Sequence, residues 1–171
     1  MEKAKHCKVC ENLDFNIHCG TKCGLTGKKP DFQHKCSKIK FGSALEKVIT
    51  EIAVENKLID KEKVNYISSF FIYLFISIGF IAGGILLTQK LFGYGLFHTV
   101  TLVIIGIGAL ILPKSFGYLY AYNRKNKVAK KKLKELKELL KIYRLDYETN
   151  IDIENIHGIN EVKAQVKVFR S

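Results

Sequence analysis

Five cysteines lie within the first 36 residues, and the rest of the 171-residue chain contains none. They begin with Cys7-Lys-Val-Cys10, a C-x2-C pair, and continue with Cys19, Cys23 and Cys36. Four cysteine thiolates in tetrahedral arrangement are a common ligand set for structural zinc. A segment of about 40 residues is too small to be stable through its own core, and a bound metal is a common remedy. We therefore expect a zinc-binding head over residues 1–42.

Other chemistries of the same cysteines stay open. Disulfides require an oxidising compartment, and an iron–sulfur cluster also accepts four thiolates. Redox catalysis through Cys7 and Cys10 would require a thioredoxin-like βαβ pattern, which the sequence lacks. Three histidines near cysteines could replace a ligand, namely His6, His18 and His34. Cys23 could be joined by Cys36, or it could form a C-x3-C pair with Cys19, as in a zinc ribbon.

The residues after Cys23 carry a resemblance. The stretch Cys23-Gly-Leu-Thr-Gly-Lys-Lys-Pro30-Asp-Phe32 precedes Cys36, so it reads C-x-L-T-x-x-x-P-x-F-x-x-x-C and follows the C-x2-C pair. This pattern resembles a small cysteine domain found near the N-termini of uncharacterised bacterial membrane proteins. The ligand set that the resemblance implies is Cys7, Cys10, Cys23 and Cys36. It leaves Cys19 outside the pattern and implies no reaction.

The head should also contain a few apolar contacts. Gly24 and Gly27 allow a tight backbone beside Cys23, and Pro30 stiffens the approach to Cys36. We expect a miniature core made of Leu13, Phe15, Ile17, Leu25 and Phe32.

Two long uncharged stretches follow the head. Residues 64–89 form a run of 26 residues without a charge, and residues 91–113 form a second run of 23. A helix of roughly 20 apolar residues crosses the hydrocarbon core of a bilayer. A soluble domain this small could not bury both runs, and the first lies too far along the chain for a signal peptide. We expect transmembrane helices over residues 64–89 and 97–121, joined by an external turn over residues 90–96.

Charge is distributed unevenly along the chain, whose formal net charge is +12. Residues 1–42 carry nine lysines against four acidic residues, and residues 124–144 carry ten basic residues against two acidic ones. Short basic flanks stay in the cytoplasm, which predicts a bacterial cytoplasmic (inner) membrane protein with both termini inside. The cations expected to bind lipid headgroups or an acidic partner are Arg124, Lys125, Lys127, Lys130, Lys131, Lys132 and Lys134. Nucleic acid is the less economical partner.

Amphipathic helices should adjoin both spans. The sequence Ser43-Ala-Leu-Glu46 matches a capping box and starts a juxtamembrane helix over residues 43–63. A basic helix over residues 122–147 has apolar residues at alternating steps of four and three, which is an a/d seam. The seam consists of Ala129, Leu133, Leu136, Leu140, Tyr143 and Tyr147. It is too short to stand alone, so we expect it to pack antiparallel on the helix of residues 43–63.

The tail over residues 148–171 has the period of a strand. Apolar and polar residues alternate from Val162 to Val168 and again at Ile151-Asp-Ile153, with turn residues between the two segments. A β-hairpin is therefore expected. Two strands alone are marginal in water, so this hairpin should dock on another surface, such as a second copy of itself.

Small residues occur in both spans. Gly79-Phe-Ile-Ala-Gly83 is a GxxxG motif followed by Gly84, and the second span contains Gly106 and Gly108. In lipid, small residues let helix backbones approach closely, so we expect packing within the hairpin, self-association between copies, or both. Neither span has an ionisable residue at its centre, the usual mark of a channel or transporter.

No catalytic constellation stands out in the sequence, and a zinc ion held by four thiolates has no open position for a substrate. The sequence therefore predicts a mainly α-helical membrane protein with a zinc-ribbon-like knuckle, and no enzyme. We expect an oligomeric adaptor or scaffold that presents the zinc-bound head and the basic stalk helix to partners in the cytoplasm. Two alternatives stay open: a pore-forming or membrane-disrupting effector of a defence or toxin system, and a membrane tether for nucleic acid.

Overall fold

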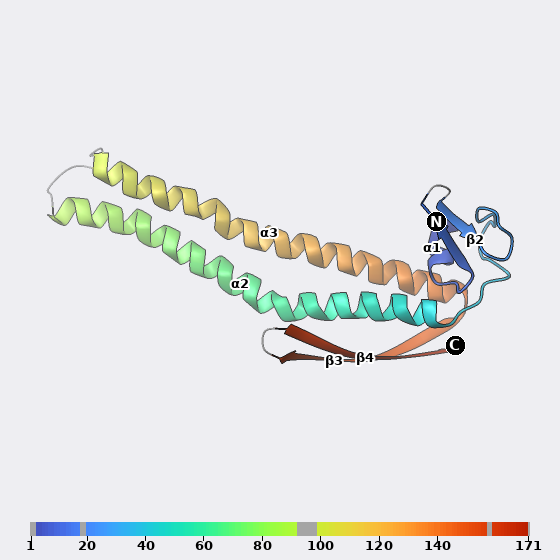
Figure 1. Cartoon of the computed structure of the whole chain (residues 1–171). Coiled ribbons are helices and arrows are strands. Elements are labelled where there is room, and N and C mark those ends of the chain that lie inside the picture. Colours follow the sequence, from blue (N-terminus) through green and yellow to red (C-terminus); the bar gives the residue numbers. More distant parts are fainter. Residues whose placement is uncertain (1–2, 18–19, 92–98, 157–158, 171) are drawn as a thin grey trace. The chain divides into compact units, whose positions relative to one another are not determined.

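Two long helices dominate the computed structural model of the chain (Figure 1). The residues it describes are 3–17, 20–91, 99–156 and 159–170. The chain divides into two compact units. The first, called the stalk unit, comprises Met1–Lys57 and Ala129–Ser171. The second, called the span unit, is Leu58–Val128.

The first long helix, α2, runs without interruption from Ser43 to Leu91. It starts at the expected residue and continues through the expected first span. The Ser43 amide donates to the Glu11 carboxylate at 3.3 Å and the Glu46 amide to the Gly42 carbonyl at 3.2 Å, in place of the expected contacts between Ser43 and Glu46. The second long helix, α3 (Thr99–Ile142), is similarly continuous. It ends five residues before the expected end at Tyr147, because the left-handed backbone of Arg144 (φ 54°) stops the helix.

Both long helices could cross a membrane by length and composition. Their most apolar 18-residue windows have mean hydropathies of 2.4 in α2 and 1.9 in α3. Only 11% and 17% of these windows are buried, whereas the core helix of a soluble domain is mostly buried. The expected turn over residues 90–96 lies mainly outside the described residues.

The stalk unit has one apolar core, which the two helices share with the head. The buried cluster consists of Val9, Leu45, Ile49, Leu136, Leu139 and Leu140. Leu45 and Ile49 are 1% and 0% exposed and come from the start of α2. The three leucines come from the end of α3, and the a/d seam predicts two of them, Leu136 and Leu140. The expected pairing of the start of α2 with the end of α3 is therefore present.

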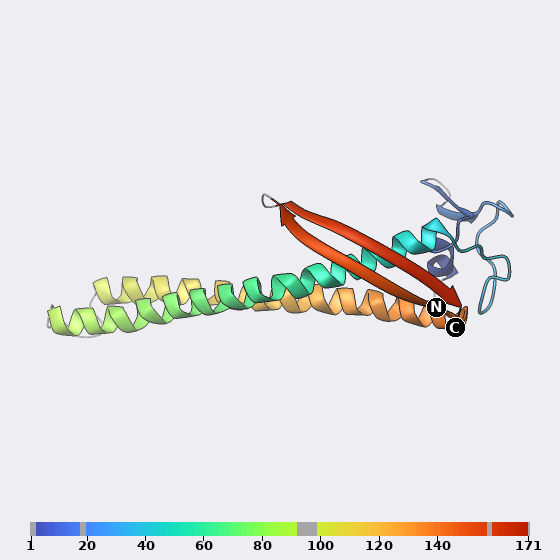
Figure 2. The same ribbon diagram turned by 90° about the horizontal axis from the view of Figure 1, so that it is seen from below.

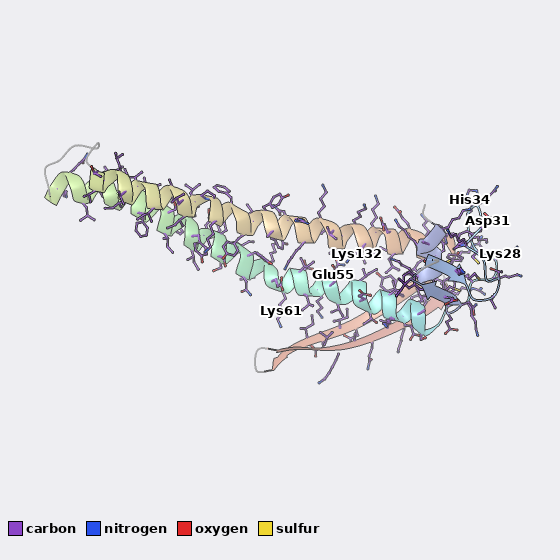
Figure 3. The ribbon with its side chains drawn as sticks, turned by 45° about the horizontal axis from the view of Figure 1, so that its top comes forward. Lys28, Asp31, His34, Glu55, Lys61 and Lys132 are labelled. Carbon is purple, nitrogen blue, oxygen red and sulfur yellow. The ribbon has the colours of Figure 1, made fainter. Side chains whose placement is uncertain are left out.

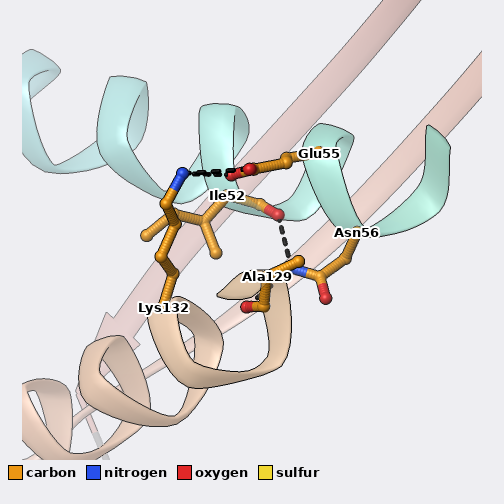
Figure 4. Close-up of polar contacts among 5 residues, drawn as sticks. All are labelled: Ile52, Glu55, Asn56, Ala129 and Lys132. Atoms are coloured by element: carbon orange, nitrogen blue, oxygen red, sulfur yellow. Dashed lines mark hydrogen bonds and ion pairs between the residues drawn. The ribbon is translucent and has the colours of Figure 1, made fainter. Parts of the chain in front are cut away.

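Polar contacts reinforce the helix pair (Figure 4). Lys132 and Glu55 form an ion pair at 2.7 Å across the two helices. The Asn56 side-chain amide donates to the carbonyl oxygens of Ile52 at 2.8 Å and of Ala129 at 3.5 Å. Asn56 interrupts the apolar face of α2, and this pair of bonds satisfies its donor.

The C-terminal hairpin is longer than the sequence suggests. Strands β3 (Leu145–Ile156) and β4 (Ile159–Arg170) pair antiparallel over their whole length. Both lie along the first part of α2 (Figures 1 and 2). Four side chains pack against the stalk core: Leu145, Tyr147, Val166 and Val168. The Lys57 ammonium also donates to the Ile151 carbonyl, so the hairpin docks on its own stalk, and pairing with a second copy stays a prediction.

The head is built from α1 (Lys3–Lys8), β1 (Leu13–Asn16) and β2 (Gly20–Cys23). The expected miniature core was wrong for most of its members. Their exposed fractions are 38% for Leu13, 68% for Phe15, 88% for Ile17 and 58% for Leu25. A two-stranded sheet has no second layer under which to bury these side chains. The head instead buries Val9, which is 2% exposed, in the stalk core.

In the span unit, α2 and α3 pack antiparallel. The Ser77 hydroxyl donates to the Gly108 carbonyl at 2.7 Å. A Cβ added to Gly108 would lie 2.8 Å from Ile81, and one added to Gly84 would lie 2.8 Å from Ile104. These two glycines are therefore required for the close approach of the helices.

Candidate metal centre

The β1–β2 hairpin brings distant cysteines together. Its antiparallel register places Cys23 opposite Leu13, three residues after Cys10. The Gly24 amide then donates to the Asn12 carbonyl at 2.8 Å and extends the pairing past Cys23. The 13-residue separation of Cys10 and Cys23 in sequence is thereby closed by strand pairing.

Tight turns precede β1 and follow β2, at the open end of the hairpin. The Cys10 amide donates to the Cys7 carbonyl at 3.0 Å, which closes the C-x2-C turn. After Cys23, the amides of Thr26 and Gly27 donate to its carbonyl at 3.1 and 2.7 Å. Gly27 has a left-handed φ of 65°, which a glycine adopts without strain.

All four cysteines of the implied set line one cavity of about 300 Å³. Burial raises the pKa of the Cys7 thiol, and the nearby Cys10, Cys36 and Cys23 raise it further. The four thiols are therefore neighbours across this cavity. Four thiolates so close together would repel one another unless a cation lay between them.

Two of the sulfur atoms already accept hydrogen bonds. The Leu25 backbone and the Thr26 hydroxyl bond to Cys23 and lower the pKa of its thiol. The Lys40 amide donates to the Cys10 Sγ at 3.5 Å. Donors directed at sulfur favour the thiolate form, which is the form that binds metal.

The four sulfurs are not gathered at bonding distance from one point. Among the described residues, no three cysteine, histidine, aspartate or glutamate side chains converge closely enough to hold a metal ion. The four cysteines share a cavity and two of them accept hydrogen bonds at sulfur. Zinc therefore stays a prediction.

The histidines considered as alternative metal ligands differ in their burial. His6 is 2% exposed and stacks edge-on against Phe32, at 5.2 Å between ring centroids. His34 is exposed and lies on the outer loop of the head, away from the helices (Figure 3). His18 and Cys19 lie outside the described residues. His6 thus acts as a packing residue of the head.

Tyr143 joins the head to the stalk, and the sequence did not identify it as a functional residue. Its hydroxyl accepts a hydrogen bond from the Cys36 amide at 3.0 Å and contacts the His6 Nδ1 at 2.8 Å. Because the hydroxyl accepts from Cys36, it can donate its own proton to His6. The only sequence signal was the place of Tyr143 in the a/d seam.

The seven basic residues of α3 that were expected to bind lipid headgroups or an acidic partner fall into two groups. Lys125 and Lys132 face α2 and are paired with Glu62 and Glu55. Lys134 lies 3.9 Å from Glu138 and is 78% exposed. No ion pair within the described residues involves the remaining exposed cations, Arg124, Lys127, Lys130 and Lys131. Of the seven cations expected to bind an external anion, only these four are therefore outside an ion pair in the described part of the chain.

The glycines of the spans also have different surroundings. Gly84 and Gly108 lie in the contact between the two helices, whereas a Cβ added to Gly79, Gly83 or Gly106 would meet no atom within 4 Å. Gly79 and Gly83 instead line a shallow apolar groove on the surface of the span unit. The two glycines of the GxxxG motif therefore lie outside the contact between α2 and α3 in the described residues.

Four thiolates around one zinc ion form a closed tetrahedral site, which holds a fold together and leaves no position for a substrate.

Comparison of the chain with protein-family models, with curated proteins and with solved structures found no match.

Proposed function

We propose that the protein is a non-enzymatic adaptor of a bacterial cytoplasmic membrane, with a zinc-bound head fixed to a helical stalk. The observation that carries this proposal is the double contact of Tyr143 with Cys36 and His6. Together with the burial of Val9 in the stalk core, it makes the head an integral end of the stalk. A head fixed in this way offers a partner one defined surface.

In this proposal one zinc ion is bound by Cys7, Cys10, Cys23 and Cys36. Zinc with four thiolates carries a net charge of −2, which nearby cations can balance. Four lysines line the same cavity: Lys28, Lys29, Lys35 and Lys38. Zinc would stabilise the head, which has few buried apolar side chains of its own.

The membrane anchor is supported by the two exposed apolar helices, and the basic flanks favour cytoplasmic termini. We also propose that copies associate through the open groove at Gly79 and Gly83. Small residues at such a surface let a second helix approach closely in lipid. Self-association would place several heads side by side, which suits an adaptor.

The experiment is proximity labelling in cells from a labelling enzyme fused to the N-terminus, comparing the unmodified chain with Cys23→Ser. We expect a defined set of cytoplasmic neighbours that is lost in the variant, while both proteins remain in membranes after alkaline extraction. Leu25→Ser, which changes an exposed side chain beside the site, is the control and should keep the neighbours.

An identical set of neighbours for all three proteins would contradict the adaptor role of the head. Release of the chain by alkaline extraction would contradict the membrane anchor. Leakage of ions through vesicles that contain the purified chain, abolished by Gly83→Leu, would favour the pore-forming alternative instead.

A further inference from the structure

The span unit contains two lysine–tyrosine clusters on the same pair of helices. In the first, the Lys125 ammonium bonds to the Tyr66 hydroxyl at 2.7 Å and to the Glu62 carboxylate at 3.3 Å. In the second, the Lys114 ammonium lies 4.7 Å from the centroid of the Tyr73 ring. Tyr73 in turn stacks on Tyr118, with 5.3 Å between centroids and an angle of 14°. The second set is called the Lys114 cluster below.

The two clusters are related by the register of the helix pair. Moving eleven residues, or about three turns, along α3 leads from Lys125 back to Lys114 on the same face of the helix. Moving eleven residues forward along α2 leads from Glu62 to Tyr73. Tyr73 therefore stands where the first cluster has its carboxylate, and Lys114 faces a ring instead of a negative charge.

Nothing else in this region can balance the Lys114 charge. The sequence contains no aspartate or glutamate from residue 63 to residue 134. Glu62, the nearest acid on α2, is already paired with Lys125. Within the described residues the charge of Lys114 thus has aromatic neighbours and no carboxylate.

The position of Lys114 raises the free energy of a cation that has no carboxylate beside it. Lys114 directly follows the 23-residue uncharged run and so lies at the expected edge of the hydrocarbon layer. A cation near a low-dielectric layer is stabilised much more by a contacting anion than a cation in bulk water would be. Gly117, one turn later on the same face, leaves open space beside it, because an added Cβ there would meet no atom within 4 Å.

We propose that the Lys114 cluster is a binding site for the phosphate of an anionic phospholipid. The Lys114 ammonium supplies the charge, and the Tyr73 hydroxyl, which lies beside it, supplies a hydrogen bond to a phosphate oxygen. The absence of a side chain at Gly117 lets the headgroup approach the helix backbone beside Lys114. This inference rests on the proposed membrane anchor, and it names a ligand that the anchor alone does not require.

The test is native mass spectrometry of the full chain in detergent, with phosphatidylglycerol, phosphatidylcholine and inorganic phosphate as separate probes. We expect phosphatidylglycerol to bind more tightly than phosphatidylcholine, and Lys114→Gln to reduce the phosphatidylglycerol affinity about fivefold. Lys125→Gln removes a cation that already has a carboxylate and is the matched control. It should change the affinity much less.

A second variant tests the register argument. Tyr73→Glu places a carboxylate opposite Lys114, as Glu62 is placed opposite Lys125, and should abolish the preference for phosphatidylglycerol while the helical content is kept. Equal phosphatidylglycerol affinities for the unmodified chain and Lys114→Gln would overturn the proposal. Displacement of the lipid by millimolar inorganic phosphate would overturn the lipid as the ligand.

Failure of the lipid site can be told from failure of the anchor. Alkaline extraction of membranes reports on the anchor without reference to any one lipid. A chain that stays in the membrane but shows no lipid preference retains its anchor and lacks this site. A chain that is released from the membrane loses both.

Discussion

The Tyr143 hydroxyl accepts a hydrogen bond from the amide of Cys36, a residue 107 positions earlier, at 3.0 Å. Tyr143 lies directly after α3, so this bond ties a proposed zinc ligand to the end of the stalk. The same hydroxyl contacts His6, which precedes Cys7. Both halves of the cysteine set are therefore positioned from one phenol oxygen.

Tyr143→Phe should loosen the metal site without unfolding the stalk. It leaves the Cys36 amide and the His6 Nδ1 without their partner, and outer partners of metal ligands affect metal affinity about 10- to 100-fold. We expect release of zinc to a coloured chelator to become at least tenfold faster. Tyr147→Phe removes a hydroxyl in the same core that does not bond to Cys36 or His6 and is the control. Equal rates for both variants would refute the role of Tyr143.

Zinc content tests the ligand set directly. The purified chain should contain about one zinc ion, as measured by elemental analysis. Cys23→Ser and Cys36→Ser should each lose it, whereas Cys19→Ser should keep it. Equal dependence on Cys19 and Cys36 would show that the implied set is wrong, and bound iron in place of zinc would favour the cluster alternative.

The sequence predicts most of the helical architecture, because uncharged runs and apolar periodicity act locally. The start of α2 at Ser43 and the buried seam at Leu136 and Leu140 follow from such patterns. The bonds of Tyr143 do not, since their partners lie more than 100 residues away. No spacing rule connects a seam tyrosine with the backbone amide of a cysteine in another element.

For the head, a local pattern in the sequence predicted a core that is not formed. Leu13, Phe15 and Leu25 looked like a core because they are apolar and close in sequence. They are exposed, because the head obtains its burial from the stalk through Val9. The end of α3 was also misplaced: Tyr147 continues the seam in sequence, but after the turn at Arg144 it reaches the same core from β3.

The glycines of the spans should divide into two functional classes. A side chain at Gly108 would collide with Ile81 and Ser77, so Gly108→Leu should separate the helices and lower the thermal midpoint of the chain in detergent. Gly83→Leu meets open space within the chain. It should keep the thermal midpoint and shift the sedimentation of the protein towards a smaller oligomer. Unchanged sedimentation would remove the support for self-association through this groove.

The packing of the C-terminal hairpin should weaken in alkali. Burial raises the pKa of Tyr147 above its ordinary value of 10, and Asp146 raises it further. The unfolded chain therefore loses this proton at a lower pH than the folded chain does. The resulting stabilisation is complete below about pH 10 and is lost as pH rises through the raised pKa.

Thermal unfolding in detergent, followed by circular dichroism between pH 8 and pH 11, measures this effect. We expect the unmodified chain to lose more stability above about pH 10 than Tyr147→Phe, which has no proton to lose at this position. Lysines also begin to deprotonate in this range, but they do so in both proteins and cancel in the comparison. Parallel pH profiles would mean that Tyr147 ionises as freely in the folded chain as in the unfolded one, and that its packing against the stalk core is not maintained in solution.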